Sequence, residues 1–114
     1  MQEIAVCLAD WEHECCGDAR AVGDAVSMKV FCHDGQFVEQ RHDYDNEISI
    51  QVISGTITGI AWAPAILERV DEVSRTIAGY GPPVPVQSTE FEPDANAWKY
   101  VFMVATDDAL PALD

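Results

Sequence analysis

Cysteine and histidine side chains that could bind a metal ion gather in the first third of the chain. Thiolate sulfur and imidazole nitrogen are the ligands that tetrahedral zinc sites use. The candidate ligands are Cys15, Cys16, Cys32 and His33, with His13 close by in the sequence. A small zinc-binding protein is therefore one hypothesis for this chain, and zinc is the one cofactor that its residues suggest.

The spacing of these residues favours a structural role for the thiols instead. Structural zinc sites use pairs of ligands with about two to four residues between them, whereas Cys15 and Cys16 are adjacent. On a strand, Cys32 and His33 would point to opposite faces. Adjacent cysteines also form a strained disulfide ring. We therefore expect reduced, metal-free cysteines, with zinc as the alternative.

Signatures of catalysis are absent from the sequence. There is no phosphate-binding loop, dinucleotide fingerprint or nucleophile elbow. The histidines His13, His33 and His42 lie in or beside polar segments, where surface histidines are common. The sequence predicts a protein that is not an enzyme, although a site that combines a histidine with a cysteine or carboxylate stays open.

Aromatic residues offer candidate binding positions. Trp11 and Trp62 fall at the ends of expected strands, and Tyr44 lies in a polar segment. Half-exposed aromatic side chains at such places can contact a partner. The alternative is that the two tryptophans cap the core of the domain.

The charge is strongly negative, because twenty acidic residues face six basic ones and the net charge is −14. Such a field repels phosphate, so we expect no direct binding to nucleic acid. It suits a solubilising surface or a protein partner, which could be basic. The leading hypothesis is an acidic interaction module that binds a protein through loops and strand-end aromatics. A nucleic-acid mimic that inhibits a basic protein is a further alternative.

Length and hydropathy point to one soluble domain. The 114 residues suit a single domain, with residues 106–114 as a tail that frays or lies on the surface. No apolar run approaches the ~18 residues of a membrane span, and the first residues are acidic. We expect a cytoplasmic protein that has no membrane contact.

Alternating apolar residues predict a mainly β fold. Ile4, Val6 and Leu8 alternate with small residues, and Trp98 begins a similar pattern near the end. The expected strands cover residues 3–12, 21–35, 48–62 and 98–108.

Two glycines mark expected irregularities in these strands. Gly23, followed by Asp24, suits a tight turn in which the aspartate bonds to nearby backbone amides. Gly55 suits a bend or bulge in the third strand. Before it, Ile48, Ile50 and Val52 alternate, as expected of a strand.

The period changes after residue 63. Ile66, Leu67, Val70, Val73 and Ile77 recur at helical spacing. They predict a helix within residues 64–80, although the β-branched content leaves a strand open. Residues 82–97 read as an extended, proline-bearing connection or edge strand. The expected fold is a small, bent β-barrel of SH3-like or OB-like type, with one helical or irregular insertion before the last strand.

One combination of residues resembles a known family. Trp11 is followed by Cys15-Cys16-Gly17 and then by Val22-Gly23-Asp24. This pattern is similar to that of a family of small, uncharacterised actinobacterial proteins, classed as a domain of unknown function. The resemblance covers about the first 60 residues and, more loosely, the last strand. It implies a shared fold and no activity, substrate or catalytic residue.

Overall fold

The computed structural model describes residues 2–9, 19–33, 35–40, 50–90 and 97–108. These residues form β-strands and no helix. The strands are β1 (Gln2–Ala9), β2 (Ala25–His33), β3 (Gln36–Glu39), β4 (Gln51–Arg69), β5 (Arg75–Tyr80), β6 (Val84–Val86) and β7 (Trp98–Thr106).

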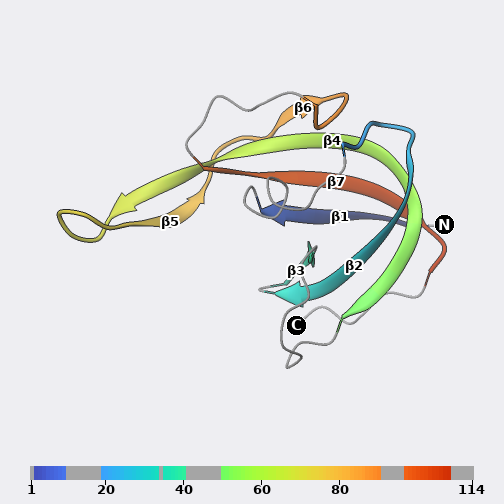
Figure 1. The fold of residues 1–114 in the computed structure, drawn as a ribbon, viewed down its shortest axis with the longest axis horizontal. Helices are drawn as coiled ribbons and strands as arrows, with labels where there is room; N and C mark the ends of the chain where they lie inside the picture. Colours follow the sequence, from blue (N-terminus) through green and yellow to red (C-terminus); the bar gives the residue numbers. More distant parts are fainter. Residues whose placement is uncertain (1, 10–18, 34, 41–49, 91–96, 109–114) are drawn as a thin grey trace.

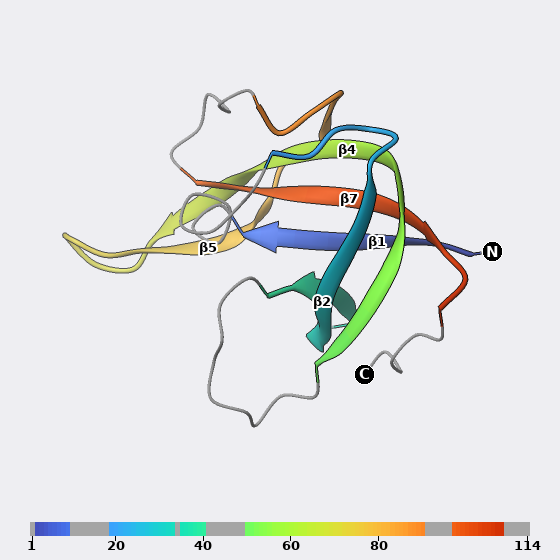
Figure 2. The same cartoon turned by 45° about the vertical axis from the view of Figure 1, so that its right-hand side comes forward.

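Five of these strands close into a barrel (Figures 1 and 2). Their order is β2-β3-β1-β7-β4, and pairing between β2 and β4 completes the circle. All neighbours are antiparallel except β1 and β3, which pair in parallel at Val6 and Phe37. The predicted mainly β barrel is confirmed.

The barrel interior is mainly apolar and follows the alternation expected of β1 and β7. Ile4, Val6 and Leu8 point inward, as predicted, and so do the alternate residues of β7 from Trp98 onward. The buried apolar cluster is completed by Met28, Val30, Phe37, Ile53, Ile57, Ile60, Tyr100, Phe102 and Val104. Together these side chains form the hydrophobic core of the barrel.

The alternating apolar residues at the start of β4 lie on the outer face of the barrel. Val52 is 57% exposed, Ile50 is exposed as well, and the buried residue between them and Gly55 is Ile53. Apolar residues stand on both faces of this segment, and a shift of one residue exchanges the faces. Ile48 lies outside the described residues.

An irregularity occurs in β4, but three residues after the position we expected. Ile57 pairs with Val104 and Gly59 pairs with Met103, so Thr58 is the extra residue of a bulge. The bulge shifts the alternation by one, which is why both Ile57 and Ile60 are buried.

Gly55 has a different role, because it lets two strands approach closely. Here β4 passes from pairing with β2 to pairing with β7. A Cβ atom on Gly55 would lie 2.3 Å from the carbonyl oxygen of Ala105 and 2.8 Å from a methyl carbon of Val104. Only glycine fits at this crossing without a backbone shift.

The turn at Gly23 forms as predicted. Gly23 has a φ of 98°, a conformation that other residues rarely adopt. The amide of Asp24 donates to the carbonyl of Ala21 at 3.1 Å, and the Asp24 carboxylate accepts from the Ala21 amide at 2.8 Å. The Gly23 amide also donates to the carbonyl of Ile57, which anchors the turn to β4.

The helix predicted within residues 64–80 is wrong. β4 continues to Arg69, and β5 returns beside it as a hairpin. The apolar residues at helical spacing are exposed in this hairpin, and the barrel core is already filled. β-Branched residues favour the extended chain over a helix that would have no surface to pack against. After it, β6 pairs with β4 as a short strand that contains Pro85, in line with the expected edge strand.

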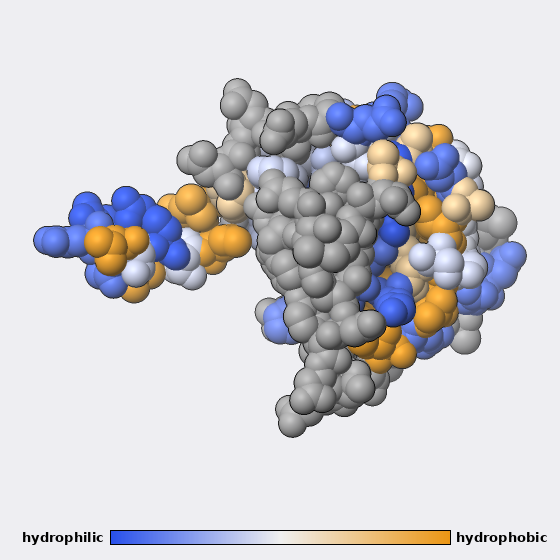
Figure 3. Space-filling view, viewed as in Figure 1, coloured by the Kyte–Doolittle hydropathy of each residue, from blue (hydrophilic) through white to orange (hydrophobic). Residues whose placement is uncertain are grey.

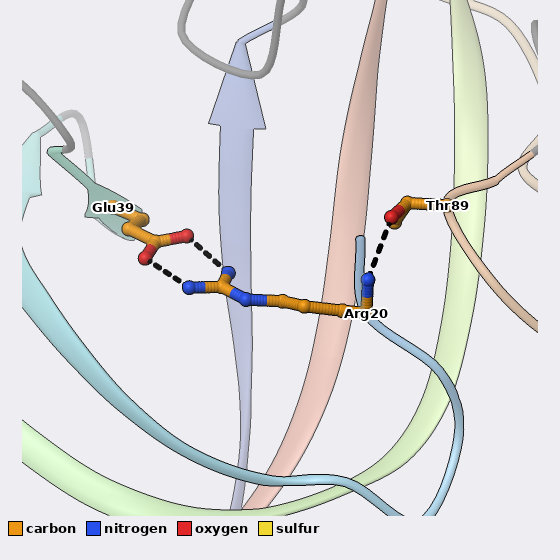
Figure 4. A network of polar contacts seen from close by, with 3 residues as sticks. All are labelled: Arg20, Glu39 and Thr89. Atoms are coloured by element: carbon orange, nitrogen blue, oxygen red, sulfur yellow. Dashed lines mark hydrogen bonds and ion pairs between the residues drawn. The ribbon is translucent and has the colours of Figure 1, made fainter. Parts of the chain in front are cut away.

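A buried ion pair ties three segments together inside the barrel (Figure 4). The guanidinium of Arg20 donates to both carboxylate oxygens of Glu39, at 2.5 and 2.6 Å. The side chains are only 13% and 3% exposed. Arg20 also exchanges hydrogen bonds with Thr89, and its guanidinium carbon lies 5.1 Å from the centre of the Phe102 ring. This network joins the residues before β2 to the last residue of β3, Glu39, and to Thr89, which follows β6.

Candidate functional site

The most distinctive surface of the molecule is the hairpin that projects from the barrel (Figures 1 and 3). It consists of Ala65–Arg69 of β4, the turn at residues 70–74, and β5. We call it the β-arm. Its exposed apolar residues are Ile66, Leu67, Val70, Val73, Ile77 and Tyr80. Figure 3 shows these apolar side chains interspersed with hydrophilic ones beyond the body of the barrel.

One face of the β-arm combines apolar and basic side chains. Residues that pair across an antiparallel ladder share a face. Leu67 pairs with Ile77, and Arg69 pairs with Arg75. Tyr80 lies on the same face, because it pairs with Ala65, which is two residues before Leu67. We call these five residues, Leu67, Arg69, Arg75, Ile77 and Tyr80, the arginine face.

The base of the arginine face adjoins the barrel through Lys99. The ammonium nitrogen of Lys99 lies 4.2 Å from the centre of the Tyr80 ring, within range of a cation–π contact. Beyond Lys99, a shallow groove of about 440 Å³ runs over the outer side of β1 and β7. Its lining includes Lys99, Val101, Cys7 and Gln36. The lining also contains Glu3 and is otherwise mainly apolar, so the apolar surface continues from the β-arm onto the barrel.

The tip of the β-arm is ordered by the side chain of Asp71. Its carboxylate accepts hydrogen bonds from the amides of Val73 at 2.9 Å and Ser74 at 2.8 Å. The amide of Val70 donates to the carbonyl of Ser74 and closes the turn. The bonds from the Val73 and Ser74 amides lower the pKa of the Asp71 carboxyl below the ordinary aspartate value.

We expect the order of this tip to depend on pH. The pKa of Asp71 is lower in the folded arm than in the unfolded chain, so its ionised form stabilises the tip. That stabilisation is present above the unfolded pKa and is lost as pH falls through the folded pKa. The amide NMR shifts of Val73 and Ser74 should therefore titrate with a midpoint below the pKa of an ordinary aspartate.

Asp71→Asn is the control for this titration, since the amide side chain can still accept a hydrogen bond but does not ionise in this range. In that variant the acid transition of the two amides should disappear. A midpoint at or above the ordinary aspartate value would show that the two hydrogen bonds do not form in solution.

Of the three binding residues predicted from the sequence, the structure describes Trp62. Trp62 is half-buried and packs against the core, in line with the alternative in which it caps the barrel. Trp11 and Tyr44 lie outside the described residues. Trp98, which we expected in the core, is buried.

The proposed zinc ligands are likewise not brought together where the structure describes them. Cys32 is half-buried and faces the core, whereas His33 is exposed on the opposite face of β2. Neighbouring side chains that point apart do not reach one ion. Cys15 and Cys16 lie outside the described residues. Within the described ranges, no group of three or more His, Cys, Asp and Glu side chains could hold a metal ion.

Among the cysteines that the structure describes, the thiols of Cys7 and Cys32 are free. Cys7 lies on the outer side of β1, and its thiol is 3.8 Å from the side-chain oxygen of Gln36. Cys32 faces the interior, so the two sulfur atoms are on opposite sides of the barrel wall. The described part of the chain also has no helix with the length and apolar character needed to cross a membrane.

Sequence reasoning missed the β-arm, although the sequence carries a signal for it. Two segments with β-branched residues, 66–70 and 76–80, flank a mainly polar centre at residues 71–75. That centre contains Asp71, a residue that favours tight turns because its side chain can bond to amides two and three residues ahead. Two β-forming segments around such a turn indicate a hairpin.

Comparisons of the chain with protein-family models, with curated proteins and with solved structures find no match. The resemblance to the small actinobacterial family thus stays a prediction.

Proposed function

We propose that this protein is an interaction module whose β-arm contacts a protein partner. The observation that carries the proposal is the β-arm itself, which holds six large apolar side chains outside the barrel. Hydrophobic side chains grouped on one projecting element are costly to leave in water, and such patches mark interaction sites. The closed barrel serves as a rigid support for the arm.

The negative charge of the chain supports this proposal, because it attracts a partner over a longer distance than the apolar contacts do. A net charge of −14 attracts a partner that is basic overall and raises the rate of encounter. Trp11 and Tyr44 stay candidates for additional contacts. We place the protein in the cytoplasm and its barrel in the SH3-like or OB-like class as predictions from the sequence.

A pull-down that compares matched variants tests the proposal. The bait is the full chain, as wild type, as Leu67→Ser/Ile77→Ser, and as Val52→Ser. Leu67 and Ile77 are 44% and 49% exposed on the β-arm, and Val52 is 57% exposed on the barrel. All three changes remove exposed apolar surface, so their effects on folding should be similarly small.

We expect wild type and Val52→Ser to retain the same protein from a host lysate, and the double arm variant to lose most of it. A direct titration with the purified partner should then show at least a tenfold weaker Kd for the double variant. Equal retention by all three baits would show that the β-arm is not the contact element.

A further inference from the structure

The β-arm has a free strand edge. β5 pairs with β4 on one side, and among the described strands it has no partner on the other. An unpaired edge presents a row of backbone N–H and C=O groups that can accept another strand. Addition of an extended segment to such an edge is a recurrent mode of peptide recognition. The geometry of the arm therefore suits a partner segment in the extended conformation.

The side chains beside this edge are positively charged in a strongly acidic protein. Arg69 and Arg75 stand directly opposite each other on the ladder, an arrangement in which like charges repel. Arg69 donates to the carbonyl of Asp71 at 3.1 Å, and Arg75 donates to that of Ser74 at 3.3 Å. Neither guanidinium has a carboxylate partner among the described residues. A carboxylate from outside would relieve this repulsion.

We propose that β5 binds an extended segment of the partner in which carboxylate side chains alternate with apolar ones. This inference rests on the proposed function and specifies the chemistry of the partner. Arg75 and Ile77 are two residues apart and share a face of the strand. An added strand would place every second side chain over that face. An acidic residue beside Arg75 and an apolar residue beside Ile77 would then lie two positions apart in the partner.

The arginine face continues this pattern toward the barrel. Tyr80 adds an apolar ring, and the ammonium of Lys99 lies against it. Arg69, Arg75 and Lys99 are three of the six basic residues of the whole chain. Arg69 and Arg75 lie on the β-arm and Lys99 lies at its base on β7. Glu68 pairs with Thr76 on the opposite face of the arm, and Asp71 and Glu72 lie at its tip. The arginine face itself therefore attracts carboxylates, whereas the chain as a whole attracts cations.

Affinity selection from a display library of random linear peptides tests the proposal. The bait is the full chain at near-physiological salt, where the field of distant charges is screened beyond about 8 Å. We expect wild type to enrich peptides in which Asp or Glu alternates with Leu, Ile or an aromatic residue. The variant Arg69→Glu/Arg75→Glu should instead enrich peptides in which Lys or Arg takes the acidic positions. Val52→Ser, which alters exposed apolar surface on the barrel, should select the same peptides as wild type.

Three results would overturn the proposal. If wild type selects basic peptides, the net charge of the chain governs recognition and the arginine face does not. If the charge-reversed variant selects the same peptides as wild type, the edge of β5 is not the site. If no peptide is enriched, the arm does not bind linear segments, although a folded partner could still satisfy the proposed function. Sedimentation of the neutral variant Arg69→Gln/Arg75→Gln tests one further outcome. If this variant self-associates while the charge-reversed variant selects the same peptides as wild type, the arginines only keep the strand edges of different copies apart.

Discussion

Glu39→Gln is expected to lower the free energy of unfolding by about 3–5 kcal/mol. The change removes the negative charge that neutralises Arg20, whose side chain is only 13% exposed. Arg20 would keep its charge, because guanidinium does not lose its proton in proteins. A buried charge without a counter-ion is one of the few single-site defects that cost this much. Chemical denaturation followed by the fluorescence of the buried Trp98 would measure the loss.

A double variant separates the cost of a lost partner from the value of the pair. Arg20→Met/Glu39→Leu replaces both charges by apolar groups of similar length, and such replacements are often neutral or stabilising. We therefore expect the double variant to be more stable than Arg20→Met alone or Glu39→Leu alone. If the two single losses simply add in the double variant, the two side chains do not interact in solution.

Gly55→Ala is expected to destabilise the barrel by about 2–3 kcal/mol or more. The added methyl group would meet the backbone of β7 at the Ala105 carbonyl, 2.3 Å away. A flexible side chain could rotate aside, but a backbone carbonyl in a paired strand moves only if the strand moves. Because β4 and β7 pair and both contribute side chains to the core, a shift of β7 at Ala105 would also disturb the core packing.

Gly59→Ala is the matched control, since Gly59 lies four residues further along the same strand. A Cβ atom there would lie 3.7 Å from the Met103 side chain, which is an ordinary van der Waals contact. Alanine also reduces the conformational entropy of the unfolded chain, so this variant should be as stable as wild type or up to about 1 kcal/mol more stable. Equal thermal melts for the two variants would mean that β4 and β7 are not in close approach at Gly55.

Elements with one apolar face and one face of small or polar residues could be predicted from the sequence. In β1 and β7 the alternation has a single phase, so the buried face follows directly. The start of β4 carries isoleucine and valine on both faces, and only pairing with β2 and β7 decides that Ile53 is buried and Val52 is not. The turn at Gly23 could be predicted because its chemistry is local.

The β-arm could not be predicted in full, because its apolar residues are compatible with a helix and with a strand. The spacing from Ile66 to Ile77 fits a helix, whereas the β-branched side chains in this stretch favour a strand. The choice depends on whether the barrel offers a surface for a helix to cover, and that surface exists only in the assembled fold. The opposition of Arg69 and Arg75 likewise follows from a ladder register that no local pattern specifies.

The placement of β1 between β3 and β7 has a consequence for how the chain folds. β1 is synthesised before its antiparallel partner β7, and Gln2 of β1 pairs with Thr106 of β7. Contacts between segments that are far apart in the sequence form slowly, because a long loop must close before any pairing stabilises it. Ile4, Val6 and Leu8 therefore stay without their main partner until β7 has left the ribosome. During that interval the nascent chain exposes a β-forming apolar segment, and protection by a chaperone would matter most then.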